Sequence, residues 1–146
     1  MKKVTIFIAF LAVVLVGSLT ASAESPKDIL VVVHASVKNE KVTRDELRNI
    51  FLKKRISWSN GIRAVPLHST NAALRNDFRM RLLEMNEGEE KRYWQRFQIR
   101  KGEAEPVSFN NTLKAVFQLK GSVSYIYRSH YREGVTNVIM VLPARE

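Results

Sequence analysis

Residues 64–78 read Ala64-Val-Pro-Leu-His-Ser-Thr-Asn-Ala-Ala-Leu-Arg-Asn-Asp-Phe78, and the rest of the chain is organised around this stretch. Its pattern predicts a short buried strand over Val65–Leu67, a polar corner over His68–Asn71 and then an amphipathic helix. A strand that turns directly into a helix aims several unpaired backbone N–H groups at one point, with the positive end of the helix dipole behind them. Such a corner can bind an anion without a metal or a cofactor.

The chain before the corner predicts one strand and one helix. Ile29–His34 is a β-branched run, typical of a fully buried strand in a parallel or mixed sheet. Thr43-Arg-Asp-Glu46 has the form of a capping box, and the apolar spacing after it predicts a helix over about Arg44–Leu52. His34 at the strand end is interpreted as a structural histidine.

The chain after the corner predicts two longer helices. Apolar residues recur at helical spacing from Ala72 to Met85, and a second helix is predicted over Glu89–Gln98. The second helix has an aromatic side, which we expect to face the core, and a basic side. These sides are formed by Tyr93, Trp94 and Phe97, and by Lys91, Arg92 and Arg96.

The C-terminal part predicts a short helix and two strands. Asn110 or Asn111 can cap the helix, Gly121 can end it, and its Leu113, Val116 and Phe117 are expected to face inward. Strands are predicted over Ser122–Tyr127 and Val135–Leu142. The resulting order, β-α-β-α-α-α-β-β, predicts an α/β domain with a small mixed β-sheet covered by about four helices.

The N-terminus has the pattern of a secretory signal peptide. A basic start is followed by an apolar run over Val4–Val16 and by Ala21-Ser-Ala23, a small-x-small cleavage pattern. The run is short for a bilayer span, which needs about 20 residues. The sequence therefore predicts a signal peptide over residues 1–23, one domain over residues 24–146, periplasmic localisation and no stable membrane insertion after cleavage.

Composition excludes some chemistry and favours anionic partners. The chain has no cysteine, which excludes disulfides, thiol catalysis, thiolate metal sites and a lipid-modified cleavage site. Its 24 basic and 14 acidic side chains give a formal charge of +10, or +8 once Lys2 and Lys3 leave with the signal. Such a charge favours oxyanions, anionic surfaces or acidic proteins as partners.

The sequence predicts no enzyme, no metal site and no cofactor. Ser69 lacks the glycines of a nucleophile elbow, and the three histidines fit no metal-ligand spacing. The acidic pairs Asp45-Glu46 and Glu89-Glu90 lie in first helical turns, where carboxylates favour the helix dipole. Nucleic-acid binding is not expected either, because the aromatic residues among the central arginines are grouped as core residues are and the export signal separates the chain from most nucleic acid.

The candidate ligand residues are at the two helix starts. Ser69, Thr70 and Asn71 form the corner, Arg75 follows one turn later, and Ser108 begins a segment of similar chemistry. These side chains could hold an inorganic oxyanion. Alternatively, the three corner residues only cap the helix that follows.

The motifs together resemble a known family. Val42-Thr-Arg-Asp-Glu-Leu-Arg-Asn-Ile-Phe-Leu52, the later Trp58 and Gly121-Ser-Val-Ser-Tyr-Ile126 resemble, in order and spacing, phosphate-type (PstS-like) periplasmic substrate-binding proteins of ABC transporters. The resemblance covers most of the chain from Ile29 onward. It corresponds only to the second lobe of these two-lobed proteins and its connecting strands.

The resemblance implies a periplasmic-binding-protein-like domain with Ser69 as a ligand contact and Ser108 as a weaker one. The family's glycine-rich phosphate loop is replaced here by Thr70-Asn-Ala-Ala-Leu74. Our first hypothesis is therefore an exported, non-catalytic binding or adaptor domain with weak phosphate or other oxyanion binding. The alternative is a structural or protein-interaction module of the cell envelope that has lost the ligand site, with an envelope protein or a second copy as partner.

Overall fold

The structure of the chain is a computed structural model, which describes residues 23–134 and 137–145. Nearly all of the predicted signal peptide lies outside these residues. So does the start of the last predicted strand, Val135. Among the described residues, no helix combines the length and apolar character that a membrane span requires.

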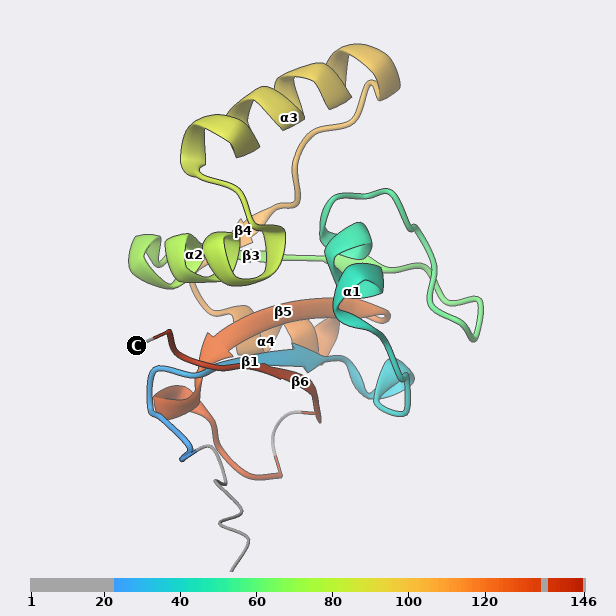
Figure 1. Ribbon diagram of the computed structural model, residues 1–146. Coiled ribbons are helices and arrows are strands. Elements are labelled where there is room, and N and C mark those ends of the chain that lie inside the picture. The colour runs from blue at the N-terminus through green and yellow to red at the C-terminus, as the bar shows by residue number, and fades with distance from the viewer. Residues whose placement is uncertain (1–22, 135–136, 146) are drawn as a thin grey trace, which may run out of the picture.

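The domain is α/β and is built on a four-stranded mixed sheet with the order β2-β5-β1-β6 (Figure 1). The strand β1 (Ile29–Val33) is fully buried and pairs antiparallel with both β5 (Ser122–Tyr127) and β6 (Asn137–Leu142). The short β2 (Val65–Pro66) pairs parallel with β5. The predicted sheet is therefore confirmed as a mixed sheet, in which β1 is antiparallel to both of its neighbours.

Alternate residues of β1 face two cores. Ile29, Val31 and Val33 pack with α1 (Arg44–Phe51) and α2 (Ala72–Phe78), whereas Leu30 and Val32 pack with α4 (Thr112–Gln118). Because strand side chains alternate between faces, an unbroken apolar strand must be covered on both sides. This explains why helices lie above and below the sheet.

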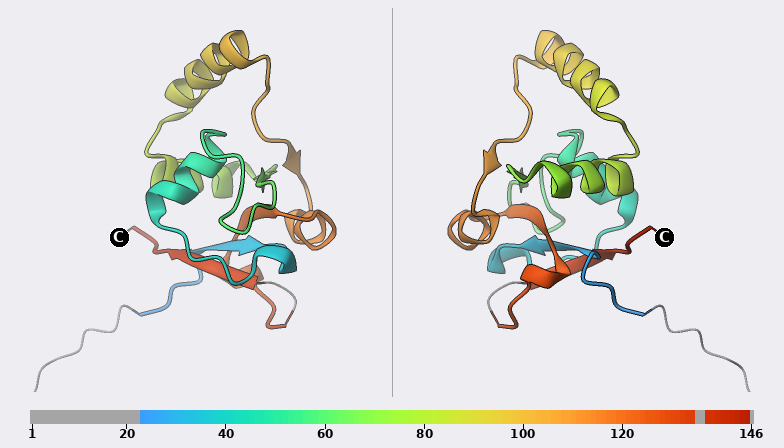
Figure 2. Two further views of the ribbon diagram at one scale, coloured as in Figure 1. Left: turned by 90° about the vertical axis from the view of Figure 1, so that its right-hand side faces the viewer. Right: turned by 90° about the vertical axis from the view of Figure 1, so that its left-hand side faces the viewer.

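The helix α3 (Glu87–Lys101) forms a further tier. It lies beyond α1 and α2, on the side away from the sheet, in all three views (Figures 1 and 2). Its Trp94 and Phe97 are buried and belong to the same core cluster as α1 and α2, as the aromatic spacing predicted. Capping boxes begin α1 at Thr43 and α3 at Asn86, and α3 starts two residues before and ends three residues after its predicted bounds.

The helix predicted over about Ala72–Met85 is present to Leu83, but its second half is not an α-helix. The α-helix ends at Phe78 and continues as one π-helical turn, Arg79–Leu83, before Glu84 adopts a left-handed conformation. This wider turn coincides with two buried arginines. Arg81 donates from Nη1 to the carbonyl of Lys27 at 2.8 Å, and Arg79 pairs with a carboxylate of α3.

Two expectations for α4 are also wrong. Phe117 is 72% exposed instead of facing the core. Asn111 caps the helix as one of the two predicted alternatives, but α4 ends at Gln118, so Gly121 does not terminate it.

Gly121 has φ +77°, and a Cβ there would lie 2.1 Å from the carbonyl oxygen of Arg63. Close approach of two backbone segments, which puts β5 beside β2, is the reason for this glycine.

Replacing Gly121 with alanine should destabilise the fold by roughly 3 kcal/mol or more, because the left-handed backbone and the clash with Arg63 add together. Gly61→Ala is the matched control: Gly61 has φ +81° but no atom within 4 Å of the added Cβ. We expect this control to cost only about 1–2 kcal/mol. Urea unfolding of both variants measures the difference, and equal losses would contradict the close-approach explanation.

Candidate functional site

The predicted polar corner is part of a second, two-stranded parallel sheet. His68 and Ser69 form β3 (His68–Ser69), which pairs with β4 (Ser108–Phe109) in the register His68 to Ser108. The corner between the strand and α2 is therefore reduced to Thr70 and Asn71, instead of the predicted His68–Asn71. This pairing brings two of the predicted ligand residues, Ser69 and Ser108, onto adjacent strands although 39 positions separate them in the sequence.

The polar groups of the corner are used to cap α2 and to tie it to the β4 segment. Ser69 Oγ accepts from the backbone N–H of Asn71 at 3.1 Å, and Asn71 Oδ1 accepts from the N–H of Leu74 at 3.0 Å. The hydroxyl of Thr70 donates to Asn110 Oδ1 at 2.6 Å. Of the three residues that the sequence offered as caps, only Asn71 caps α2, whereas Ser69 bonds to the N–H of Asn71 and Thr70 bonds to Asn110.

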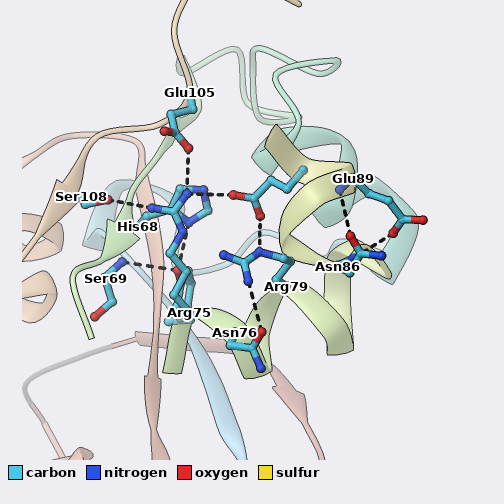
Figure 3. Close-up of polar contacts among 11 residues, drawn as sticks. His68, Ser69, Arg75, Asn76, Arg79, Asn86, Glu89, Glu105 and Ser108 are labelled. Atoms are coloured by element: carbon cyan, nitrogen blue, oxygen red, sulfur yellow. Dashed lines mark hydrogen bonds and ion pairs between the residues drawn. The ribbon is translucent and has the colours of Figure 1, made fainter. Parts of the chain in front are cut away.

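Arg75 is the residue around which the candidate ligand residues meet. Its Nη1 donates to Ser108 Oγ at 3.1 Å, and its Nη2 lies 2.8 Å from Glu90 Oε1 and 2.7 Å from Glu105 Oε2. Figure 3 shows Glu105 and Ser108 converging on this guanidinium from different sides. The structure therefore brings Arg75 and Ser108 together, with two carboxylates that the sequence did not predict at this place.

Glu90 links α3 to α2 through a buried ion-pair network. Its second oxygen lies 2.8 Å from Arg79 Nε, and Arg79 Nη1 donates to Asn76 Oδ1 at 3.2 Å (Figure 3). The side chains of Arg79 and Glu90 are only 9% and 5% exposed. Burial by itself would raise the pKa of Glu90, but hydrogen bonds from Arg75 and Arg79 outweigh it and hold the pKa below its usual value.

The interpretation of Glu89-Glu90 as a pair that serves only the helix dipole is wrong. Glu89 completes the capping box with Asn86, and Glu90 is the buried partner of two arginines. A sequence signal for this pairing exists: Arg75 and Arg79 are four residues apart and so lie on one face of a helix. Two arginines on the buried side of a helix require an acidic partner.

A cleft with a volume of about 910 Å³ opens between the corner, α2 and α3. Its α3 wall includes Trp94, Gln95 and Gln98. Three cations and three carboxylates line the cleft, so it has no excess of either charge: Arg75, Arg79, Lys91, Glu87, Glu90 and Glu105.

His68 lies beneath this cleft and is 1% exposed. Its Nδ1 is 2.9 Å from the hydroxyl of Tyr125, which also accepts the N–H of Ser69 at 3.4 Å. Among the described residues, its Nε2 has no hydrogen-bond partner. Burial, with the neighbouring charge of Arg75, lowers the pKa of His68 to about 3, so the imidazole is neutral at pH 7.

Metal binding finds no support in residues 23–134 and 137–145, where no group of three or more histidine or acidic side chains is placed to hold an ion. A scan against protein-family models matches none to this chain, and a search of the curated proteins finds no match. The site must therefore be interpreted from its own geometry.

Glu90→Gln should lower the free energy of unfolding by roughly 3 kcal/mol, because it leaves the buried guanidinium of Arg79 and that of Arg75 without their shared carboxylate. Glu105→Gln is the matched control, since it removes a carboxylate from the same Arg75 but one that is 49% exposed. The control should cost at most about 1 kcal/mol. Urea denaturation at pH 7 tests both, and a small loss for Glu90→Gln would refute its structural role.

Burial of neutral His68 should make stability depend on pH. The folded-state pKa is about 3 and the ordinary value is 6.5, so the unfolded chain binds the proton first as pH falls. The contribution of neutral His68 to the free energy of unfolding is complete well above pH 6.5 and is lost progressively as the pH falls below that value. We expect a loss of roughly 1.4 kcal/mol between pH 7.5 and pH 5.5, a window that lies above the range in which ordinary carboxylates titrate.

His68→Gln should remove most of this pH dependence. Tyr125→Phe is the control, because it deletes the hydrogen-bond partner of His68 but keeps the buried imidazole. It should lower stability by a similar amount at every pH and retain the slope. Thermal unfolding followed by circular dichroism across this range makes the comparison, and an unchanged slope in His68→Gln would show that other groups cause it.

Proposed function

We propose that the protein is an exported, non-catalytic binding module that holds a small oxyanion weakly against Arg75, in competition with its own Glu105. One observation carries the proposal: an exposed carboxylate of the chain itself lies 2.7 Å from Arg75 Nη2. The position of that carboxylate is one at which the protein already stabilises negative charge, next to the hydroxyl of Ser108.

The two carboxylates on Arg75 differ in how readily they can be displaced. Glu90 is buried and shared with Arg79, so removing it from Arg75 breaks a network that holds α3. Glu105 is half exposed, belongs to the loop between α3 and β4 and makes its one ion pair within the described residues to Arg75. A free anion can therefore replace Glu105 while Glu90 stays in place.

Glu90 and Glu105 already neutralise the charge of Arg75, which limits the affinity of the site for a free anion. A few charge-assisted hydrogen bonds contribute roughly 1.5–3 kcal/mol each, and the entropy of association offsets much of this gain. The tethered Glu105 also competes at an effective concentration of about millimolar order. These terms support a dissociation constant for phosphate or sulfate of about millimolar order or weaker.

A binding role is favoured over catalysis by the state of the imidazole at the corner. His68 would be the natural general base there, but its pKa of about 3 and its burial make it a poor proton acceptor near neutral pH. The predicted contacts Ser69, Thr70 and Asn71 contribute less in this proposal than Arg75 and Ser108, because their side chains already bond to other groups of the chain.

Removing the competing carboxylate should strengthen anion binding. Glu105→Gln is expected to bind phosphate about tenfold more tightly than the unaltered chain, because Arg75 loses its displaceable partner. Arg75→Ala should abolish binding. Glu103→Gln is the matched control, since Glu103 is similarly exposed and in the same loop but pairs with Lys53.

Isothermal titration with phosphate and with sulfate at low ionic strength measures these affinities. Equal strengthening in Glu103→Gln and Glu105→Gln would mean that only net charge matters, which would refute the site. So would the absence of binding to Glu105→Gln at ligand concentrations on the order of tens of millimolar, well above the expected dissociation constant of that variant.

The second candidate function is a protein-interaction module whose ancestral ligand site has been lost. The observation in its favour is the internal use of the corner, where Ser69, Thr70 and Asn71 bond to neighbouring parts of the chain. It predicts that Arg75→Ala leaves function intact while changes on an exposed surface abolish it. Failure of the phosphate titration would favour this candidate.

A further inference from the structure

The side of α3 that faces away from the core has an unusual composition. We call it the α3 outer face and define it by Arg92, Arg96, Ile99 and Arg100, with Tyr93, which also packs against the core, at its edge. Four of these side chains are exposed, and Tyr93 is half-buried. In all views α3 is the tier farthest from the sheet, so this face lies at one end of the molecule (Figures 1 and 2).

The arginines of this face form a like-charge ladder. Arg92, Arg96 and Arg100 follow each other at four-residue spacing, which places them next to one another on the helix surface. None of the three forms an ion pair with a described residue, and Arg96 Nε donates only to the carbonyl of Arg92 at 3.3 Å. The helix dipole favours a cation at Arg100, which is in the last turn of α3. Like charges at four-residue spacing destabilise a helix, so intramolecular stability does not explain Arg92 and Arg96.

The same face has an apolar residue that the fold does not use. Ile99 is 85% exposed, although the opposite side of α3 buries Trp94 and Phe97. Together with Tyr93, Arg96 and Arg100 it lines a shallow hollow of about 450 Å³. Because apolar side chains and arginines line this hollow together, it suits a partner that presents one apolar side chain with carboxylates on either side of it.

The outer face is held rigidly. The hydroxyl of Tyr93 donates to the carbonyl of Leu52 at 2.7 Å, and Glu90 pairs with Arg75 and Arg79. At the C-terminal end of α3, Lys53 Nζ donates to the carbonyl of Ala104 at 2.7 Å. The backbone of a helix anchored in this way loses little conformational entropy when a partner binds, so the entropy cost is limited to the exposed side chains.

We propose that the α3 outer face is a docking surface for an acidic segment of another protein, with an apolar side chain of that segment packed on Ile99. Charge complementarity supports this occupant, because the ladder supplies three unpaired guanidinium groups, which match carboxylates in geometry. The net charge of +10 opposes a second copy of this chain as occupant. A membrane surface fits less well, because Ile99 is the one exposed apolar side chain of this face, whereas helices that lie on membranes bury a broad apolar face.

The test measures binding of a fluorescent twelve-residue peptide in which glutamates flank one leucine, by anisotropy, to the chain that begins at Glu24. The variant Arg92→Gln/Arg96→Gln/Arg100→Gln should bind at least about tenfold more weakly. The control is Lys41→Gln/Lys114→Gln/Lys120→Gln, which removes the same charge from exposed lysines outside α3 and should change affinity less than about twofold. Ile99→Ser should abolish the preference for this peptide over one with serine in place of leucine.

Equal weakening in the two triple variants would overturn the proposal, because binding would then follow net charge. Retained preference for leucine in Ile99→Ser would also overturn it. Binding to phosphatidylglycerol vesicles or to oligothymidylate that depends on the arginine ladder, without peptide binding, would assign the face to a membrane or to nucleic acid and refute the proposal. Glu105→Gln separates this surface from the oxyanion site, because Glu105 is not an anchor of α3: it should strengthen phosphate binding and leave peptide binding unchanged.

Discussion

The carboxylate of Glu90 is the contact on which the arrangement of the cleft depends. It lies in the first turn of α3 and takes one oxygen to Arg75 and the other to Arg79, both on the α2 segment. The buried Arg79 has this carboxylate as its one ion-pair partner among the described residues and would be costly to bury without it. The less buried Arg75 shares the carboxylate and also pairs with Glu105. The position of α3, the wall of the cleft and the orientation of the Arg75 guanidinium all follow from it.

The same contact explains why a helix with few buried apolar residues packs where it does. Of the α3 side chains, only Glu90, Trp94 and Phe97 are buried. Two aromatic residues do not supply the apolar stripe of a typical surface helix. Directed contacts therefore supplement packing, namely the Glu90 ion pairs and the hydrogen bond from Tyr93 to the backbone of α1. Such contacts fix the rotation of the helix about its axis, which apolar burial alone specifies weakly.

Local patterns were sufficient to predict the elements that depend on local chemistry. The β-branched run of β1, the capping box of Thr43 and the inward Trp94 and Phe97 all appear as predicted, because apolar spacing and capping act within a few residues. The pairing of β3 with β4 was not predictable in this way. Its strands are two residues long, and their register depends on the position of the whole α3 segment between them.

The predictions that failed at single residues failed for the same reason, because they depend on contacts between distant parts of the chain. Phe117 fits the helical apolar spacing of α4, yet it is exposed because the sheet below α4 is already covered by Ala115 and Val116. At the candidate site, the sequence identified Arg75 and Ser108 but not Glu90 or Glu105, since those contacts join residues 15 and 30 positions apart. A pattern on one helix shows that a buried arginine needs a partner, but only the fold shows which carboxylate it is.

The two surfaces proposed for binding lie on opposite sides of α3, and the contacts of this helix make them independent. In the proposed anion site the ligand takes the place of Glu105, which belongs to the loop after α3 and not to the helix. The contacts that fix α3 itself, those of Glu90 and of Tyr93, are unchanged by that exchange. Coupling between two sites requires an element with two arrangements that both ligands bias. Because α3 keeps these anchors whether or not Glu105 is displaced, the proposed exchange leaves the outer face in place, and Glu105 can be replaced by mutation without altering that face.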